Sequence, residues 1–153
     1  MKKFKKQEIK PDDLHDSILV SRFINQLMKG GKKHLAKKIV YRAFEIIKKE
    51  TKKNPLEIFE EAIENASPDM EVRPQRVGGA TYQVPRGVRG ERRNTLAMRW
   101  IIGISRNHKG SPMEERLAKE LILASKNEGE AVKKKINIHK MAQANKAFAY
   151  LAK

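Results

Sequence analysis

Apolar residues recur at intervals of three and four along most of this chain, and that pattern restricts the fold to a bundle of amphipathic helices. The first helical period runs from Ser17 to Lys29 and ends at Gly30-Gly31, and the second ends at Asn54-Pro55. Proline ends the second helix because it lacks a backbone donor. The later periods predict helices over residues 55–66, 91–108, 111–128 and 131–149.

Two of these helices begin with the residues of an N-terminal cap. Asn54-Pro55-Leu56-Glu57 combines a capping side chain, a proline in the first turn and a glutamate that can reach back. Ser111-Pro112-Met113-Glu114 repeats this order of residue types. We therefore expect Asn54 and Ser111 to cap the helices that follow them.

One segment lacks the helical pattern. Residues 71–90 have the sequence EVRPQRVGGATYQVPRGVRG, whose Val, Thr, Tyr and Gly content predicts a hairpin over residues 72–87 with its turn at Gly78-Gly79. Pro74 and Pro85 cannot donate hydrogen bonds within a sheet, so both strands should be edges of a ribbon that projects rather than packs. A bare hairpin is marginally stable in water, so we expect this arm to become ordered against another molecule.

The predicted fold class is therefore mainly α: a single six-helix domain with a protruding two-stranded β-hairpin arm. A chain of 153 residues can enclose one hydrophobic core, and no segment resembles a linker between domains. We expect residues 1–153 to form one domain, in which residues 1–16 are a basic extended leader and residues 72–87 are the arm.

Composition favours a polyanionic partner, since 34 Lys and Arg against 18 Asp and Glu give a net charge of +16. The absence of cysteine excludes disulfides and thiol catalysis, and the four histidines lack the spacing of a helical metal site. No catalytic triad or carboxylate pair stands out, so we expect no enzyme activity, cofactor or metal ion. No apolar run approaches the roughly 18 residues of a membrane span, so we expect no membrane partner.

The two kinds of basic residue occupy different parts of the chain. Lysines dominate the leader and the second helix, whereas arginines dominate the ribbon and the segment that follows it. Arginine suits bidentate phosphate contacts and lysine acts as a point charge, so we expect precise contacts at the ribbon and bulk neutralisation elsewhere. The third helix instead carries Glu57, Glu60, Glu61 and Glu64, which form either a docking face for a basic neighbour or a side that faces solvent.

The two prominent aromatic residues have different expectations. Tyr82 either stacks on a base or packs across the ribbon, and the sequence supports both equally. Trp100 falls on an apolar stripe with Leu96 and Ile104, so we expect it in the core. Residues 30–33 have glycines and lysines but not the spacing of a phosphate loop, so we interpret them as a helix stop beside a basic patch.

Several sequence blocks occur in the order that one family shows, of which RVGGATYQVP is the most specific and ERRNTLAMRW follows it at the family's distance. Through these blocks, nearly the whole chain resembles the small-subunit ribosomal protein seven family of the bacterial and organellar type. The resemblance implies a protein of the ribosome, in the cytoplasm or an organelle, that binds the 3′ major domain of small-subunit ribosomal RNA and nucleates assembly of the subunit head. It also implies an arm near the exit-site transfer RNA and the messenger path, with other head and platform proteins as neighbours.

Carried over by position, the resemblance implies RNA contacts from the leader, the glycine loop, the ribbon and the entry to the fourth helix. Gln75 stands where family members often have a second basic residue, and we expect Arg86 to compensate from across the ribbon. With Tyr82 added by the stacking hypothesis, the RNA-binding candidates are Lys2, Lys3, Lys5, Lys6, Lys32, Lys33, Arg73, Arg76, Tyr82, Arg86, Arg89, Arg92 and Arg93.

The alternative function is a DNA-binding regulator, in which the first two helices form a helix-turn-helix and the ribbon forms a wing. A recognition helix needs polar side chains that read base edges. The second helix offers Lys33, Lys37, Lys48 and Lys49, which bind phosphate without reading sequence, so folded RNA is the better partner.

Overall fold

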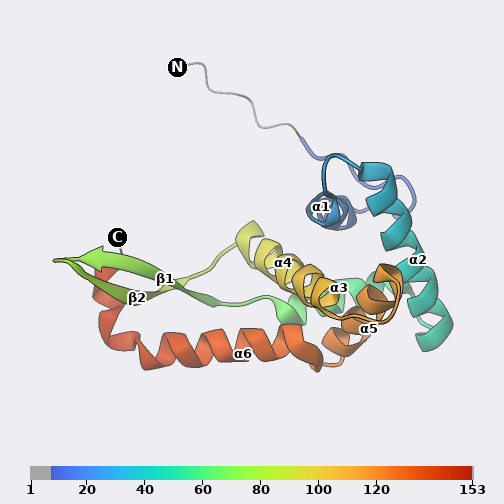
Figure 1. The fold of residues 1–153 in the computed structure, drawn as a ribbon. Helices are drawn as coiled ribbons and strands as arrows, with labels where there is room; N and C mark the ends of the chain where they lie inside the picture. Colours follow the sequence, from blue (N-terminus) through green and yellow to red (C-terminus); the bar gives the residue numbers. More distant parts are fainter. Residues whose placement is uncertain (1–7, 153) are drawn as a thin grey trace, which may run out of the picture.

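The computed structural model describes residues 8–152, in which six α-helices and one two-stranded antiparallel sheet confirm the predicted mainly α fold class (Figure 1). The strands make an arm that extends away from the helical body. The elements are α1 (Ile18–Leu27), α2 (Lys33–Thr51), α3 (Pro55–Ala66), β1 (Met70–Val77), β2 (Ala80–Gly87), α4 (Glu91–Asn107), α5 (Met113–Ser125), α6 (Gly129–Ala144) and a short 3₁₀ helix, η1 (Lys146–Leu151).

The predicted cap at α3 is confirmed, because the Asn54 side chain accepts a hydrogen bond from the backbone N–H of Leu56 at 3.1 Å. The predicted cap at α5 is wrong. This helix begins at Met113, so Pro112 occupies the capping position and Ser111 lies one residue too early to cap. The first turn of α5 relies instead on acidic residues at its positive end, Glu114 and Glu115.

The expected last helix over residues 131–149 is also wrong in its extent. It begins at Gly129, where the buried Glu120 carboxylate accepts the backbone N–H of Ala131 at 2.9 Å. It ends at Ala144, where the backbone N–H and the side-chain amide of Asn145 both donate to the carbonyl of Met141, at 3.0 and 2.9 Å. The chain then turns through η1 and returns to the arm.

The main core lies among α1 to α5 and the start of α6, with α5 in contact with α2, α3, α4 and α6. At its centre the ring of Phe59 lies 5.1 Å from Phe23 and 5.5 Å from Phe44, between centroids. Trp100 belongs to a smaller buried cluster with Val88 and Leu96, against which Ile138 of α6 packs. The predicted core position of Trp100 is therefore confirmed.

The arm has the predicted turn, and its strands pair from Met70 with Gly87 to Val77 with Ala80. It protrudes as predicted, but the expectation that it does not pack is wrong, because α6 and η1 cover one face of the ribbon. On that face Val84 is fully buried and Tyr82 contacts Phe148, with ring centroids 5.1 Å apart. Alternating apolar side chains on a two-stranded ribbon need such a cover, and this chain supplies it from its own C-terminal segment.

The described part of the leader, residues 8–16, contains a tight turn rather than extended chain throughout. Asp12 is buried, and its Oδ2 accepts the backbone N–H groups of Leu14 and His15 at 3.2 and 3.1 Å. The hydroxyl of Tyr41 in α2 donates to Asp12 Oδ1 at 2.7 Å. Burial and the nearby Asp12 raise the pKa of Tyr41, so its hydroxyl stays a donor and fastens this turn to α2.

We expect Tyr41→Phe to lower the free energy of unfolding by about 1–2 kcal/mol, because a buried carboxylate oxygen of Asp12 loses its partner. Urea denaturation measures this change. The matched control is Tyr150→Phe, since Tyr150 is exposed and should tolerate the same change without loss. Equal stabilities for the two variants would show that the hydrogen bond from Tyr41 to Asp12 does not stabilise the fold.

Candidate nucleic-acid interface

The glycine loop places Lys32 and Lys33 at the N-terminus of α2, where both side chains are exposed. Gly30 and Gly31 have φ values of 58° and 73°. Residues with a side chain rarely adopt such values, so the turn depends on glycine. The first turn of α2 contains no acidic residue. Its lysines lie at the positive end of the helix dipole, where a positive charge is unfavourable. An external anion would therefore be attracted by both the lysines and the dipole.

The base of the arm holds three of the candidate arginines in ion pairs. Arg73 and Arg92 both contact Glu71, at 2.6 and 2.7 Å, and Arg93 contacts Asp69 at 2.8 Å. Arg93 also donates to the carbonyl of Pro68 at 3.3 Å. These guanidinium groups are held in place before any nucleic acid binds.

Two other candidates, Arg86 and Tyr82, lie on β2. Arg86 donates from Nη2 to the side-chain oxygen of Gln75 at 3.1 Å, although the register pairs Arg86 with Glu71 and Gln75 with Tyr82. Arg86 therefore reaches Gln75 diagonally rather than from the opposed position. Tyr82 is half-buried against Phe148, a contact that neither of its two expected roles included.

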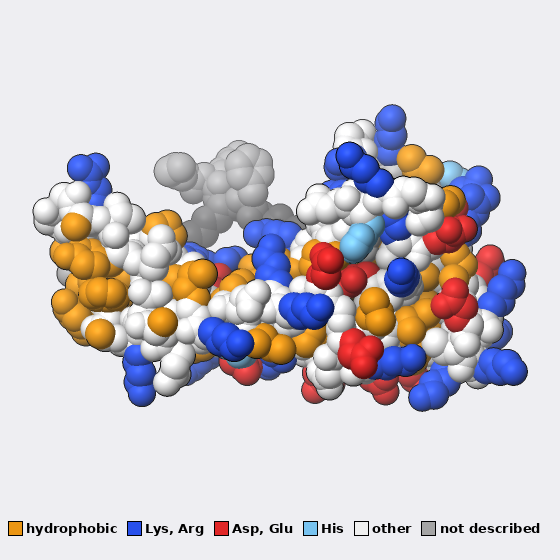
Figure 2. All heavy atoms as spheres, turned by 60° about the horizontal axis from the view of Figure 1, so that its bottom comes forward, with side chains coloured by type: hydrophobic (Ala, Val, Ile, Leu, Met, Phe, Trp, Pro, Cys, Tyr) orange, Lys and Arg blue, Asp and Glu red, His pale blue; other side chains and the backbone are white. Residues whose placement is uncertain are grey.

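Arg76 and Arg89 are exposed, and neither forms an ion pair with another residue of the described range 8–152. The face shown in Figure 2 carries Lys and Arg side chains from the far end of the arm to the helical body. The candidates Lys2, Lys3, Lys5 and Lys6 lie outside the described residues.

A groove between α1 and α4 is a part of this surface that the sequence analysis missed. It has a volume of about 380 Å³, and its walls include Gln26, Arg99, Gly103 and Arg106. Arg106 is anchored there by a hydrogen bond from Nη2 to the carbonyl of Leu27 at 2.8 Å. Positions 99, 103 and 106 fall on one helical face, so this spacing in the sequence was the signal that could have identified the stripe.

The groove suits a polyanionic backbone for a physical reason. A glycine between two arginines leaves the helix surface open, and a Cβ built at Gly103 meets no atom within 4 Å. Arg99 is exposed, while Arg106 is held partly buried by its carbonyl partner. A phosphate group could therefore approach α4 closely between two positive charges, of which that of Arg106 is held in place.

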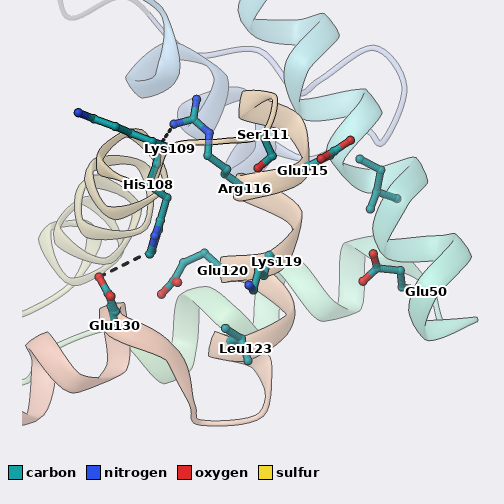
Figure 3. Close-up of a pocket in the computed structure, with 11 residues that line it drawn as sticks. Glu50, His108, Lys109, Ser111, Glu115, Arg116, Lys119, Glu120, Leu123 and Glu130 are labelled. Carbon is teal, nitrogen blue, oxygen red and sulfur yellow. Dashed lines mark hydrogen bonds and ion pairs between the residues drawn. The ribbon is translucent and has the colours of Figure 1, made fainter.

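A cavity of about 750 Å³ lies beside α5 (Figure 3). Some of its side chains hold neighbouring elements together. Arg116 donates to the carbonyls of Arg106, at 3.3 Å, and of His108, while His108 lies 3.8 Å from Glu130. Within residues 8–152, no group of three His, Cys, Asp or Glu side chains could hold a metal ion.

The acidic side chains of α3 are all exposed, namely Glu57, Glu60, Glu61 and Glu64. The two expectations for this helix, a docking face for a basic neighbour and a side that faces solvent, both remain predictions. None of the helices described for this chain combines the length and apolarity needed to cross a bilayer.

Comparison with known proteins gives a consistent result. The family described as "Ribosomal protein S7p/S5e" matches residues 1–146. The chain is 54% identical to "Small ribosomal subunit protein uS7" of Thermotoga maritima over 145 residues, which are 95% of this chain and 94% of that protein. It is 55% identical to the protein of the same name from Carboxydothermus hydrogenoformans, over 95% of this chain and 93% of that protein.

Proposed function

This chain belongs to the ribosomal protein S7p/S5e family, as a structural and non-enzymatic protein of the small ribosomal subunit, and from that premise we propose that it binds the 3′ major domain of small-subunit ribosomal RNA and nucleates assembly of the subunit head. Ribosomal RNA binding and a part in translation follow from the family. The DNA-binding alternative is not favoured, because the family match and the relatives are ribosomal.

The observation that carries the proposal is the pairing of two separate cationic regions. One lies on the helical body, at the start of α2 and in the groove that Arg99 and Arg106 line. The other lies on the arm, where Arg76 and Arg89 are exposed. Two cationic regions at a set separation match a folded RNA, whose phosphates have fixed positions, better than they match a flexible polyanion.

We propose that the body supplies most of the affinity and that the arm reaches a second target. An eight-residue strand spans about 26 Å, so Arg76 near the turn lies well away from the groove. The exit-site transfer RNA and the messenger are the proposed targets of this end of the arm. Other head and platform proteins are its proposed neighbours, and the exposed glutamates of α3 could receive a basic one.

Chemical footprinting of small-subunit RNA with this protein alone tests the proposal. We expect protection within the 3′ major domain, and we expect Arg99→Ala to weaken binding by about 1.5–3 kcal/mol because it removes a charged hydrogen-bond donor from the groove. Arg42→Ala is the matched control, since Arg42 already pairs with Glu114 at 3.5 Å and lies outside the groove.

Arg76→Ala should leave the main footprint intact and remove only protection that the end of the arm provides. A protein that binds this RNA no better than heparin would overturn the proposed function. Equal losses for Arg99→Ala and Arg42→Ala would remove the groove from the interface.

A further inference from the structure

Glu71 occupies a position between two arginines at the base of the arm. Arg92, in the first turn of α4, donates from Nε to both oxygens of Glu71 at 3.2 Å and from Nη2 to Oε2 at 2.7 Å. Arg73, two residues along β1, reaches Oε1 through Nη2 at 2.6 Å. One carboxylate thus joins a strand and a helix through two guanidinium groups.

The three side chains differ in exposure in an informative way. The Glu71 side chain is 13% exposed, whereas Arg73 and Arg92 are 46% and 42% exposed. The carboxylate therefore lies beneath two guanidinium groups whose outer edges face solvent. The neighbouring pair of Arg93 and Asp69 differs, because its acid is 65% exposed and meets solvent directly.

The charges favour this arrangement over a simple surface ion pair. Two guanidinium groups repel one another, and an ionised carboxylate between them offsets that repulsion. Hydrogen bonds from Arg92 and then from Arg73 hold the pKa of Glu71 below its usual range, so the carboxylate is charged at neutral pH. Each arginine has five N–H donors, so both keep donors for an external anion.

We propose that Glu71 is a positioning residue for RNA, which holds Arg73 and Arg92 side by side so that their exposed edges bind phosphate groups of the folded RNA backbone. This inference rests on the proposed function and deepens it. Glu71 itself is covered and does not touch the RNA. It acts by fixing the spacing of two positive charges, which a flexible polyanion does not require.

The proposal reverses the sign that charge counting predicts. Removing an acid from a protein that binds RNA raises its positive charge, and charge counting alone predicts tighter binding to every polyanion. If Glu71 positions the two arginines, its removal weakens binding to folded ribosomal RNA while binding to heparin stays the same or tightens. The ratio of the two affinities therefore separates the two explanations.

The test compares Glu71→Gln with Glu61→Gln, which removes one negative charge from an exposed position on α3. Affinities for a small-subunit RNA fragment and for heparin are measured across a salt series, with thermal melts to establish that each variant is folded. We expect Glu71→Gln to lower the affinity for the RNA fragment about tenfold, because it weakens the charged hydrogen bonds that hold Arg73 and Arg92. We expect Glu61→Gln to leave this affinity unchanged.

A second experiment tests whether Glu71 acts through Arg73 and Arg92. In the double variant Arg73→Ala/Arg92→Ala, Glu71→Gln should no longer weaken RNA binding, because the side chains through which it acts are absent. If Glu71→Gln still weakens binding in that background, or behaves like Glu61→Gln in the native one, the positioning role is wrong. Should the unaltered protein itself fail to prefer the RNA fragment over heparin, the proposed function fails instead.

Discussion

Affinity for the small-subunit RNA fragment is expected to fall by about three to five orders of magnitude between about 50 and 200 mM salt, as for a protein that contacts six to ten phosphates. The physical cause is the release of counterions from the RNA when basic side chains replace them. The described surface offers bases for this at the start of α2, in the α1–α4 groove and along the arm. Fluorescence anisotropy across a salt series measures the slope.

Single substitutions should change this slope in a predictable way. Arg76→Ala removes an exposed cation of the arm that forms no ion pair within residues 8–152, and it should reduce the slope by about one, if that residue contacts one phosphate. Arg42→Ala, whose guanidinium already pairs with Glu114, should leave the slope unchanged. A slope that stays shallow in the unaltered protein would mean that few phosphates are contacted, and would contradict binding through the cationic regions described above.

The sequence predicted those parts of the fold that depend on near neighbours in the chain. Apolar spacing located the helices, Gly78-Gly79 located the turn, and Asn54 located a cap, because each acts within a few residues. The end of the last helix was predicted too late, because apolar residues continue through the 3₁₀ helix η1 and their spacing does not mark the change of helix type after Ala144.

The sequence could not predict contacts between distant segments. Tyr82 and Phe148 are far apart in the chain, and so are Arg106 and the carbonyl of Leu27, so neither pair follows from periodicity. The basic character of the arm was predicted, but the pairing of Glu71 with both Arg73 of the arm and Arg92 of α4 depends on how β1 meets α4. Charge type is therefore visible in sequence, whereas the position of each charge requires the fold.

Contacts between distant segments also hold the arm in place. His139 of α6 accepts the backbone N–H of Asp69 through Nε2 at 3.0 Å, and Lys135 donates to the carbonyl of Asn65 at 3.0 Å. Both contacts tie α6 to the segment that leads into β1. These bonds restrain the angle at which the arm leaves the helical body, as the proposed contact of the arm with a second RNA target requires.

Phe59→Ala is expected to lower the free energy of unfolding by about 3–5 kcal/mol, because the ring is fully buried between Phe23 of α1 and Phe44 of α2. The melting temperature should fall by roughly 10 °C for a domain of this size. Thermal melts and urea denaturation measure both quantities. The change also removes the aromatic contact through which α3 holds α1.

Loss of that contact should reach the groove proposed to bind RNA, since α1 has only 10 residues and a helix of this length is marginal without tertiary packing. A loosened α1 no longer fixes Gln26 or the Leu27 carbonyl that anchors Arg106, so RNA affinity should fall together with stability. Phe148→Ala is the control, because it removes a half-buried ring of the same size from η1, which covers the arm, and leaves the groove intact. If the two variants lost RNA affinity equally, the groove would not depend on the aromatic core in this way.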